Sequence, residues 1–376
     1  MVTSSGKLLF IRRSGSAGIW AVDFDLQHLR MKGEPRLVAA SAISVSAARD
    51  GSLLYVLASD VATPAELVWV DRTGKVLEST GSVYPGIAAV TISPDRGRAA
   101  FTAQVDGQSD VWVRDLRSKV DTRISFTTFG EFDPQWIGPG RISYVQDADS
   151  GSSLRCRIVA VDAGGSGHLT ALAPPTGSSA QHAFFAPGGV HALRVIDEAG
   201  HGRLRISDVQ PDGSLGSPRP FLRFTPEPDV RGVRLNLNGA ALSPDGRLVV
   251  YENNDERHDL FVARFPGGEG PWQVSAGGGE NARWAPGSEA LYYVAGTGSG
   301  QRWLTEVKID TAQDPPVGRT TRLFDMSSFV SPGTRDWSYA VDADGRRFLV
   351  ARAVPGAAES DARMVLVQNW EAALAK

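Results

Sequence analysis

The chain has 376 residues, of which 42% are hydrophobic and 22% are charged, so it holds enough apolar material for a soluble core. The net charge is −3, and lysines and arginines are scattered along the chain. This distribution argues against nucleic acid or an anionic membrane surface as the main partner. Cys156 is the single cysteine, which excludes an internal disulfide and a thiol-only metal site.

The N-terminal residues carry no pattern of a signal peptide, because no basic region precedes an apolar stretch. No apolar run reaches the length of a transmembrane helix, so we predict no membrane insertion by this chain. A strand is predicted almost at the start, at 8–11, which is typical of a fragment of a longer protein. A short helical pattern is predicted at the other end, at 370–376.

A phrase that recurs roughly every 45 residues organises the chain. Its clearest copies are Ser93-Pro94-Asp95-Arg96-Gly97 and Ser243-Pro244-Asp245-Gly246. Proline sets φ at the second turn position, aspartate bonds its own backbone, and glycine adopts positive φ at little cost. Each copy therefore predicts a tight turn between two antiparallel strands. A repeated all-β unit of this length is typical of a propeller blade.

The predicted strands follow this pattern along the chain, because β-branched and aromatic residues alternate with polar ones. The N-terminal segment supplies the second, third and fourth strands of a first blade, at 8–11, 19–24 and 36–38. Later second strands are predicted at 53–57, 99–102, 142–145, 190–195, 248–251, 291–294 and 348–351. Third strands are predicted at 67–71, 111–115, 158–162, 204–208, 260–264, 304–310 and 364–367.

These strands predict a single all-β domain over residues 1–376, a β-propeller of four-stranded antiparallel blades. Counting second and third strands gives eight blades, with the first and last incomplete. Counting turns gives seven, so seven blades with extra terminal strands is the alternative. The predicted repeat units are roughly 1–41, 42–81, 82–128, 129–173, 174–224, 225–277, 278–325 and 326–376.

The motifs of common catalytic sites are missing from the sequence. The six histidines form neither His-x-His nor His-Glu-x-x-His, and we interpret them as solvated or core residues. A metal site from Gln181, His182 and His191 is conceivable but is not our prediction. No Gly-x-Ser-x-Gly elbow occurs, and the glycine-rich run at 296–300 joins two strands and is not a phosphate loop. We predict no cofactor, no metal and no enzyme activity.

The candidate site follows from topology. Loops between second and third strands should open on the face opposite the tight turns, and function concentrates on such loops. Polar residues just ahead of the first strands should then surround the channel mouth on that face. The candidates are Asp133, Gln135, Arg234, Asn236, Asn238, Asn281, Arg283, Arg335 and Asp336. Either they bind a peptide or a small polar ligand, or they bond one another and ordered water. The tryptophans at alternating strand positions, including Trp112, Trp136, Trp284 and Trp303, are expected to pack between blades.

The repeats resemble the blades of TolB-type and WD-like bacterial propellers. Several segments are also similar to the C-terminal propeller of bacterial receptor-like Ser/Thr protein kinases: 67–75, 261–266, 272–279, 339–350 and 365–370. This resemblance implies a sensing or interaction module appended to a kinase or another output domain. It implies no kinase activity in this chain, which lacks a nucleotide loop, a His-Arg-Asp loop and an Asp-Phe-Gly segment.

The predicted function is a non-catalytic propeller module that binds a protein, a peptide or a small polar ligand. The alternative is a propeller-based enzyme, a lyase or glycosidase with a polar site at the channel mouth, and a third reading is a structural spacer. A free-standing chain would be cytoplasmic. The same module attached to a membrane kinase would be compatible with a place outside the cytoplasm.

Overall fold

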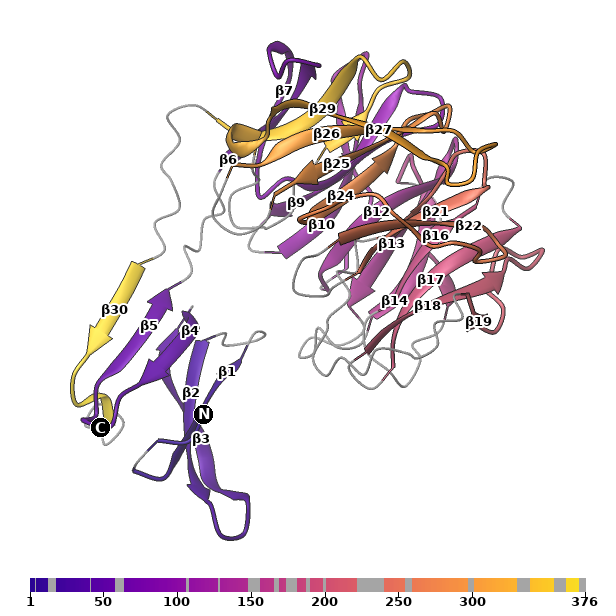
Figure 1. Cartoon of the computed structure of the whole chain (residues 1–376). Helices are drawn as coiled ribbons and strands as arrows, with labels where there is room; N and C mark the ends of the chain where they lie inside the picture. The colour runs from indigo at the N-terminus through magenta and orange to yellow at the C-terminus, as the bar shows by residue number, and fades with distance from the viewer. Residues whose placement is uncertain are drawn as a thin grey trace. The chain divides into compact units, whose positions relative to one another are not determined.

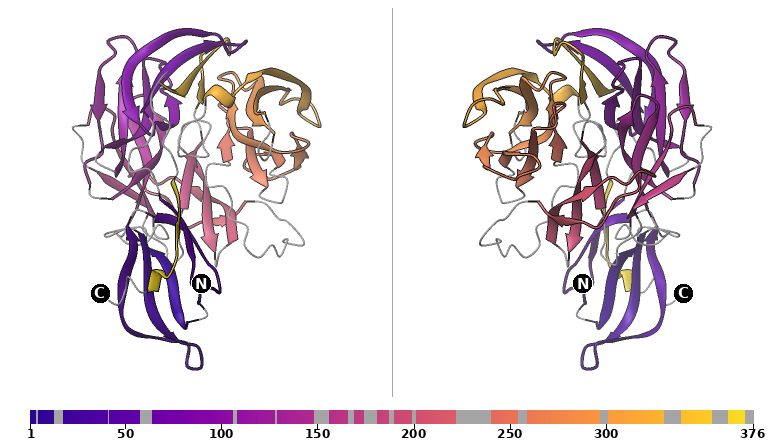
Figure 2. Two further views of the ribbon diagram at one scale, coloured as in Figure 1. Left: turned by 90° about the vertical axis from the view of Figure 1, so that its left-hand side faces the viewer. Right: turned by 90° about the vertical axis from the view of Figure 1, so that its right-hand side faces the viewer.

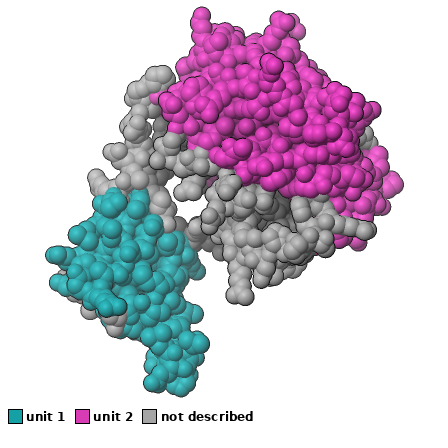
Figure 3. All heavy atoms as spheres, viewed as in Figure 1, with its two compact units in different colours: residues 1–62, 149–152, 358–376 teal, residues 63–148, 153–357 magenta. Residues whose placement is uncertain are grey.

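The computed structural model describes all residues except 4, 13–17, 41, 58–63, 106–107, 128, 148–155, 166–168, 174–180, 187–189, 199–200, 222–239, 254–258, 297–300, 330–338, 355–362 and 372–376. The chain divides into two compact units, coloured separately in Figure 3. Unit 1 comprises residues 1–62, 149–152 and 358–376, and unit 2 comprises residues 63–148 and 153–357. The sequence predicted a single domain over the same residues.

Among the described residues, the strands form eight antiparallel sheets, six of four strands and two of three strands. Five sheets of unit 2 are built from consecutive strands: β8(Ala88–Ile92)–β9(Arg98–Val105)–β10(Gln108–Asp115)–β11(Asp121–Arg123), β12(Glu131–Gly138)–β13(Arg141–Asp147)–β14(Cys156–Asp162)–β15(Thr170–Ala173), β16(Gln181–Phe185)–β17(His191–Glu198)–β18(His201–Asp208)–β19(Arg219–Pro220), β20(Ala240–Leu242)–β21(Leu248–Asn253)–β22(Asp259–Arg264)–β23(Trp272–Gln273) and β24(Gly279–Trp284)–β25(Ala290–Ala295)–β26(Trp303–Ile309)–β27(Val317–Asp325). The sixth sheet of unit 2 combines strands from both ends of the chain, in the order β28(Tyr339–Val341)–β29(Arg347–Ala353)–β6(Pro64–Asp71)–β7(Val76–Pro85). The sheets of unit 1 are β1(Lys7–Arg12)–β2(Gly18–Asp25)–β3(Arg30–Ala40) and β30(Arg363–Val367)–β5(Leu53–Leu57)–β4(Ala42–Ala47). The all-β propeller fold and the count of eight sheets confirm the prediction.

The six four-stranded sheets of unit 2 close into a ring, and many of their strands are labelled in Figure 1. Inner strands touch in the order β12, β8, β28, β24, β20 and β16, and β16 also contacts β14, which completes the circuit. Apolar side chains pack between successive sheets, as expected for blades that bury both faces. The ring leaves its first strands lining a central channel.

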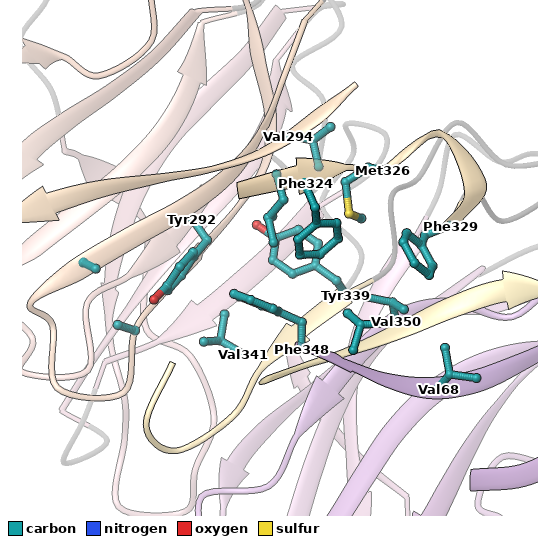
Figure 4. Packing of buried hydrophobic residues seen from close by; sticks show 14 residues of the cluster. Val68, Tyr292, Val294, Phe324, Met326, Phe329, Tyr339, Val341, Phe348 and Val350 are labelled. Carbon is teal, nitrogen blue, oxygen red and sulfur yellow. The ribbon is translucent and has the colours of Figure 1, made fainter. Parts of the chain in front are cut away.

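The sheet that closes the ring combines two distant parts of the chain. Strands β28 and β29 come from the C-terminal region, and β6 and β7 come from the N-terminal region. Figure 4 shows the core between this sheet and the β24–β27 sheet, with Val68 of β6 next to Val350 of β29. Tyr292 packs edge-on against Phe348, with ring centroids 5.2 Å apart. The closing sheet therefore has a continuous apolar core with its neighbour.

Unit 1 pairs the C-terminal strand with the N-terminal region. Strand β30 lies beside β5, and in Figure 2 it appears as the yellow strand among the indigo strands of this unit. The two three-stranded sheets pack on a shared core that contains Leu9, Ile19, Leu53 and Trp370. Trp370 is 2% exposed, so the segment after β30 also belongs to this core.

The structure corrects how two predicted repeats are built. The prediction placed second strand 53–57 and third strand 67–71 in one blade, and likewise 348–351 and 364–367. Instead β6 pairs with β29, and β30 pairs with β5. Repeats 42–81 and 326–376 have therefore exchanged their third strands. Strands β9 and β10 extend beyond the predicted ranges 99–102 and 111–115, and the loop between them is tight because Gln108 pairs with Val105.

The Ser-Pro-Asp turns form as predicted. In both clear copies the serine hydroxyl donates to the aspartate two residues on, at 2.5 Å from Ser93 and 2.6 Å from Ser243. The aspartates in turn accept backbone N–H bonds, as in Asp245 Oδ1 from Arg247 N at 3.1 Å. Among the described residues, no helix is long and apolar enough to cross a membrane.

Candidate functional site

Three inner strands of the ring share a local irregularity that shapes the channel. Residues Ala89, Asp133 and Asn281 have φ values of 52°, 52° and 55°, in the left-handed region. Each lies at a register shift between the first and second strand of its sheet. Asparagine and aspartate tolerate this conformation better than most residues, since their short side chains bond locally. The repeat thus places a bulge at the same position of β8, β12 and β24.

A pocket of about 400 Å³ occupies the channel inside unit 2. Five of the six inner strands contribute to its wall: β8, β12, β16, β20 and β24. Its polar and aromatic lining residues include Thr91, Asp133, Gln135, Trp136, Phe184, Phe185, Ser243, Asn281, Arg283 and Trp284. Both the bulge residue and the residue two positions later line the pocket, because alternate residues of one strand face the same side. A pocket of this size suits a small molecule or a few residues of a peptide.

Three charged residues line the pocket, the acid Asp133 and the bases Arg96 and Arg283. Burial raises the pKa of the Asp133 carboxyl to about 6, and the positive charge of Arg283 partly opposes this shift. Asp133 therefore changes its charge near pH 6, well above the range of an exposed aspartate. The Arg283 guanidinium is anchored by a hydrogen bond from Nη1 to the carbonyl oxygen of Ala282, at 3.0 Å. Amides from Gln135 and Asn281 supply both donors and acceptors to the same pocket.

Aromatic residues form part of the pocket wall and also join neighbouring sheets. Trp284 Nε1 donates to the carbonyl oxygen of Ala241 on β20, at 2.9 Å. Trp136 occupies the corresponding position of β12, and the Arg98 guanidinium lies 5.1 Å from its ring centroid. These tryptophans pack between sheets, as the sequence predicted, while also lining the pocket.

Four of the predicted site residues come together in this pocket: Asp133, Gln135, Asn281 and Arg283. They lie within inner strands β12 and β24, not ahead of them as the sequence analysis expected. The other candidates lie outside the described residues: Arg234, Asn236, Asn238, Arg335 and Asp336. A ligand-binding role stays a prediction for all nine residues.

The sequence analysis missed lining residues from the tight turns. Ser93, Pro94, Arg96, Ser243 and Pro244 all line the pocket, so it extends along the inner strands as far as these turns. The prediction from the sequence places function on the opposite face alone. A usable signal was present in the sequence, because each turn directly follows a first strand and must lie at one end of the channel.

Comparisons with known proteins agree on the fold. No protein-family model and no curated protein matches the chain. Among solved structures, a putative TolB from Agrobacterium tumefaciens matches with a TM-score of 0.58 and 14% sequence identity, over 78% of this chain and 99% of that one. The fold is that of a TolB-like propeller.

Weaker likenesses include two other solved structures. TolB from Acinetobacter baumannii gives a TM-score of 0.47 at 14% identity, covering 92% of this chain and 80% of that chain. The Dos1 propeller gives a TM-score of 0.43 at 12% identity, covering 96% and 92%.

Proposed function

We propose that this protein is a non-catalytic binding and sensing module, whose channel pocket in unit 2 holds a segment of a partner protein with a lysine or arginine side chain. The observation that carries the proposal is the position of Asp133. The structure keeps an acidic residue in a place where burial raises its pKa to about 6. A carboxyl moved from 3.8 to about 6 is disfavoured in its charged form by about 3 kcal/mol.

A bound cation offsets this cost. An ammonium or guanidinium group beside the Asp133 carboxylate favours the charged form, since an opposite charge at short range lowers the pKa of an acid. The amides of Gln135 and Asn281 are suited to the backbone of a peptide, and Trp136 and Trp284 offer apolar contact area. The pocket thus combines a charged anchor, amide partners and aromatic walls.

The resemblance to kinase-associated propellers fits the same proposal. In such a protein the propeller would bind a partner and an attached output domain would respond. This part of the proposal rests on sequence motifs, from 67–75 to 365–370, and it extends the binding role without being required for it.

Selection from a random peptide library displayed on phage tests the proposal at pH 7.5. The selected peptides are expected to be rich in lysine or arginine and to bind the Asp133→Asn variant at least about tenfold more weakly, because one charged anchor is lost. Glu78→Gln is the matched control, since Glu78 is exposed on β7 and is absent from the pocket lining. Peptides that bind parent and Asp133→Asn equally well would contradict the proposal.

A catalytic role toward the bound peptide itself is tested with the same peptides. A selected peptide incubated with the protein for many hours is expected to keep its mass, as measured by mass spectrometry. Steady conversion of the peptide that is lost in Asp133→Asn would replace the binding role by a catalytic one.

A further inference from the structure

Strands β6 and β30 are both third strands of the repeat, and each belongs to the sheet in which the sequence pattern would place the other. Strand β6 is the third strand after β5, yet it completes the sheet of β28 and β29. Strand β30 is the third strand after β29, yet it completes the sheet of β4 and β5. In both repeats the chain therefore passes between unit 1 and unit 2 on its way from the second strand to the third.

The two sheets can be aligned residue by residue from their turns. Ala48 N donates to Ser52 O in one turn, and Asp342 N donates to Arg347 O in the other. The next residues, Leu53 and Phe348, are therefore equivalent. Leu53 pairs with Val367 of β30, and Phe348 pairs with Val70 of β6, so the third strands are equivalent as well. The run 364–367 thus aligns with the run 67–70, and each strand fits the register of the other.

The burial of the two strands differs in a way that fits an exchange. In β6, Leu67 and Trp69 are 1% and 5% exposed. Their equivalents in β30, Met364 and Leu366, are 68% and 63% exposed. Strand β30 therefore carries large apolar residues at the two positions that the closing sheet buries, although its present sheet leaves them in water.

Charge selects which third strand lies beside β29. Arg352 of β29 lies opposite Glu66 of β6, and its guanidinium contacts the carboxylate with Nη2–Oε1 at 2.9 Å. Arg363 is the residue of β30 equivalent to Glu66. With β30 beside β29, two arginines would stand at opposite register positions, and directly opposed like charges destabilise a sheet. This contrast favours β6 and works against β30.

Further contacts hold β6 and β7 in the ring. Arg72, in the turn after β6, contacts Glu306 of the neighbouring sheet with Nη2–Oε2 at 2.9 Å. The guanidinium of Arg347 lies 4.5 Å from the ring centroid of Trp69. The present pairing is thus favoured by a small number of specific polar contacts, while the apolar register is shared by both strands.

We propose that β6 and β30 compete for the same two sheet edges, and that the chain has a second pairing in which each strand returns to its own repeat. In that pairing the sheets are β4–β5–β6–β7 and β28–β29–β30, the contiguous repeats that the sequence pattern describes. The closing sheet then loses β6 and β7, and the ring loses the Arg72–Glu306 contact. The inference stands independently of what the channel binds.

The connecting segments are long enough for either pairing. Residues 58–63 connect β5 to β6, and residues 354–362 connect β29 to β30. Segments of similar length, 148–155 and 296–302, already connect second to third strands within the ring.

Cysteine pairs distinguish the two pairings in full-length protein with Cys156→Ser. Cysteines at Leu54 and Leu366 are directly opposite in the present pairing and report it as a disulfide. Cysteines at Leu54 and Glu78 report the second pairing. Trp69 of β6 pairs with Glu78 of β7 in the structure. In the second pairing Leu54 of β5 would pair with Trp69 from the other side. Leu54 and Glu78 would then lie two strand spacings apart, about 10 Å. A bismaleimide of that reach joins them.

The deciding variant is Arg363→Glu, which leaves every contact of Glu66 intact. It places an acid opposite Arg352 in the second pairing and should raise the yield of the 54–78 cross-link roughly threefold to tenfold, with a matching fall of the 54–366 disulfide. Arg363→Gln, which removes the repulsion alone, should give a smaller rise. Adding Glu66→Arg should enlarge the effect, and Arg363→Glu alone remains decisive if that double variant does not fold.

Unchanged yields of both cross-links across parent, Arg363→Gln and Arg363→Glu would overturn the proposal. A 54–78 cross-link that joins two chains, seen as a dimer under denaturing conditions, would also overturn it, because the exchange would then occur between copies.

Discussion

Asp133 shows how a residue can weaken the fold that holds it. Its pKa is raised to about 6 by burial, whereas an exposed aspartate titrates near 3.8. Between these pH values the native state keeps a proton that the unfolded state has released. The free energy of unfolding therefore falls as the pH rises through this window, and the full loss is present above pH 6.

Asp133→Asn is expected to stabilise the protein above pH 6, by as much as about 3 kcal/mol, because the amide cannot ionise. Asparagine also suits the left-handed backbone, since Asn281 adopts the same conformation in β24. At pH 4 the variant and the parent should have nearly equal stability. Urea unfolding from pH 4 to pH 8 measures the difference, and a gain that does not depend on pH would rule out the titration of Asp133 as its cause.

The sequence alone could identify Asp133, Gln135, Asn281 and Arg283 as candidates, because polar residues near first strands must approach the channel. It could not predict that burial shifts the pKa of Asp133. That shift arises from neighbouring strands that are distant in the chain. It also could not predict that Trp136 and Trp284 line the pocket, since packing between sheets accounts equally well for their spacing.

At the scale of elements, the tight turns are stabilised by a buried serine. Ser243 is fully buried, donates to Asp245 at 2.6 Å and accepts from Leu248 N at 2.9 Å. Ser243→Ala should lower the free energy of unfolding by about 1–3 kcal/mol, because a buried N–H loses its acceptor. Denaturant unfolding measures the loss. The control is Ser46→Ala, at an exposed position of β4, and an equally small effect in both variants would contradict this role.

The β6–β7 turn makes the ion pair that joins the closing sheet to its neighbour. Glu306 is 4% exposed and contacts Arg72, and this contact holds its pKa below the usual value against the opposing effect of burial. Arg72→Ala should cost about 2 kcal/mol, because a buried carboxylate loses a partner while Lys308 remains within reach. Arg117→Ala, at an exposed turn position, is the control. Equal losses in the two variants would show that the pair contributes nothing.

The positions of the strands were predictable from alternation and turn chemistry, but two strand pairings were not. Third strands β6 and β30 fit the same register beside either β5 or β29. Local pattern therefore favours the contiguous arrangement, whereas the structure selects the exchanged one. The selection comes from side chains that meet across long sequence distances, such as Glu66 with Arg352 and Arg72 with Glu306.

At the scale of the whole molecule, the chain forms two compact units, each with apolar core residues of its own. The period of the repeat predicted the number of sheets, yet the closure of a ring by six of them depends on the pairing of β6 with β29. Unit 1 then retains two three-stranded sheets around Trp370.

Trp370→Ala should destabilise unit 1 by about 3–5 kcal/mol, because a large buried side chain is lost. Amides of β1–β5 and β30 are expected to lose protection in hydrogen exchange, while amides of β8–β27 keep theirs. Leu366→Ala, at a position 63% exposed, is the control and should have little effect. A uniform loss of protection across both units would contradict the division into two cores.

The most direct test of the channel as a cation-binding site is the pH dependence of peptide affinity. A lysine- or arginine-containing peptide selected at pH 7.5 should bind parent protein with constant affinity above pH 6. Its affinity should fall toward about tenfold per pH unit below that value, as Asp133 takes up its proton. The Asp133→Asn variant should bind weakly with no such dependence. Equal and pH-independent affinities in the two proteins would contradict the account.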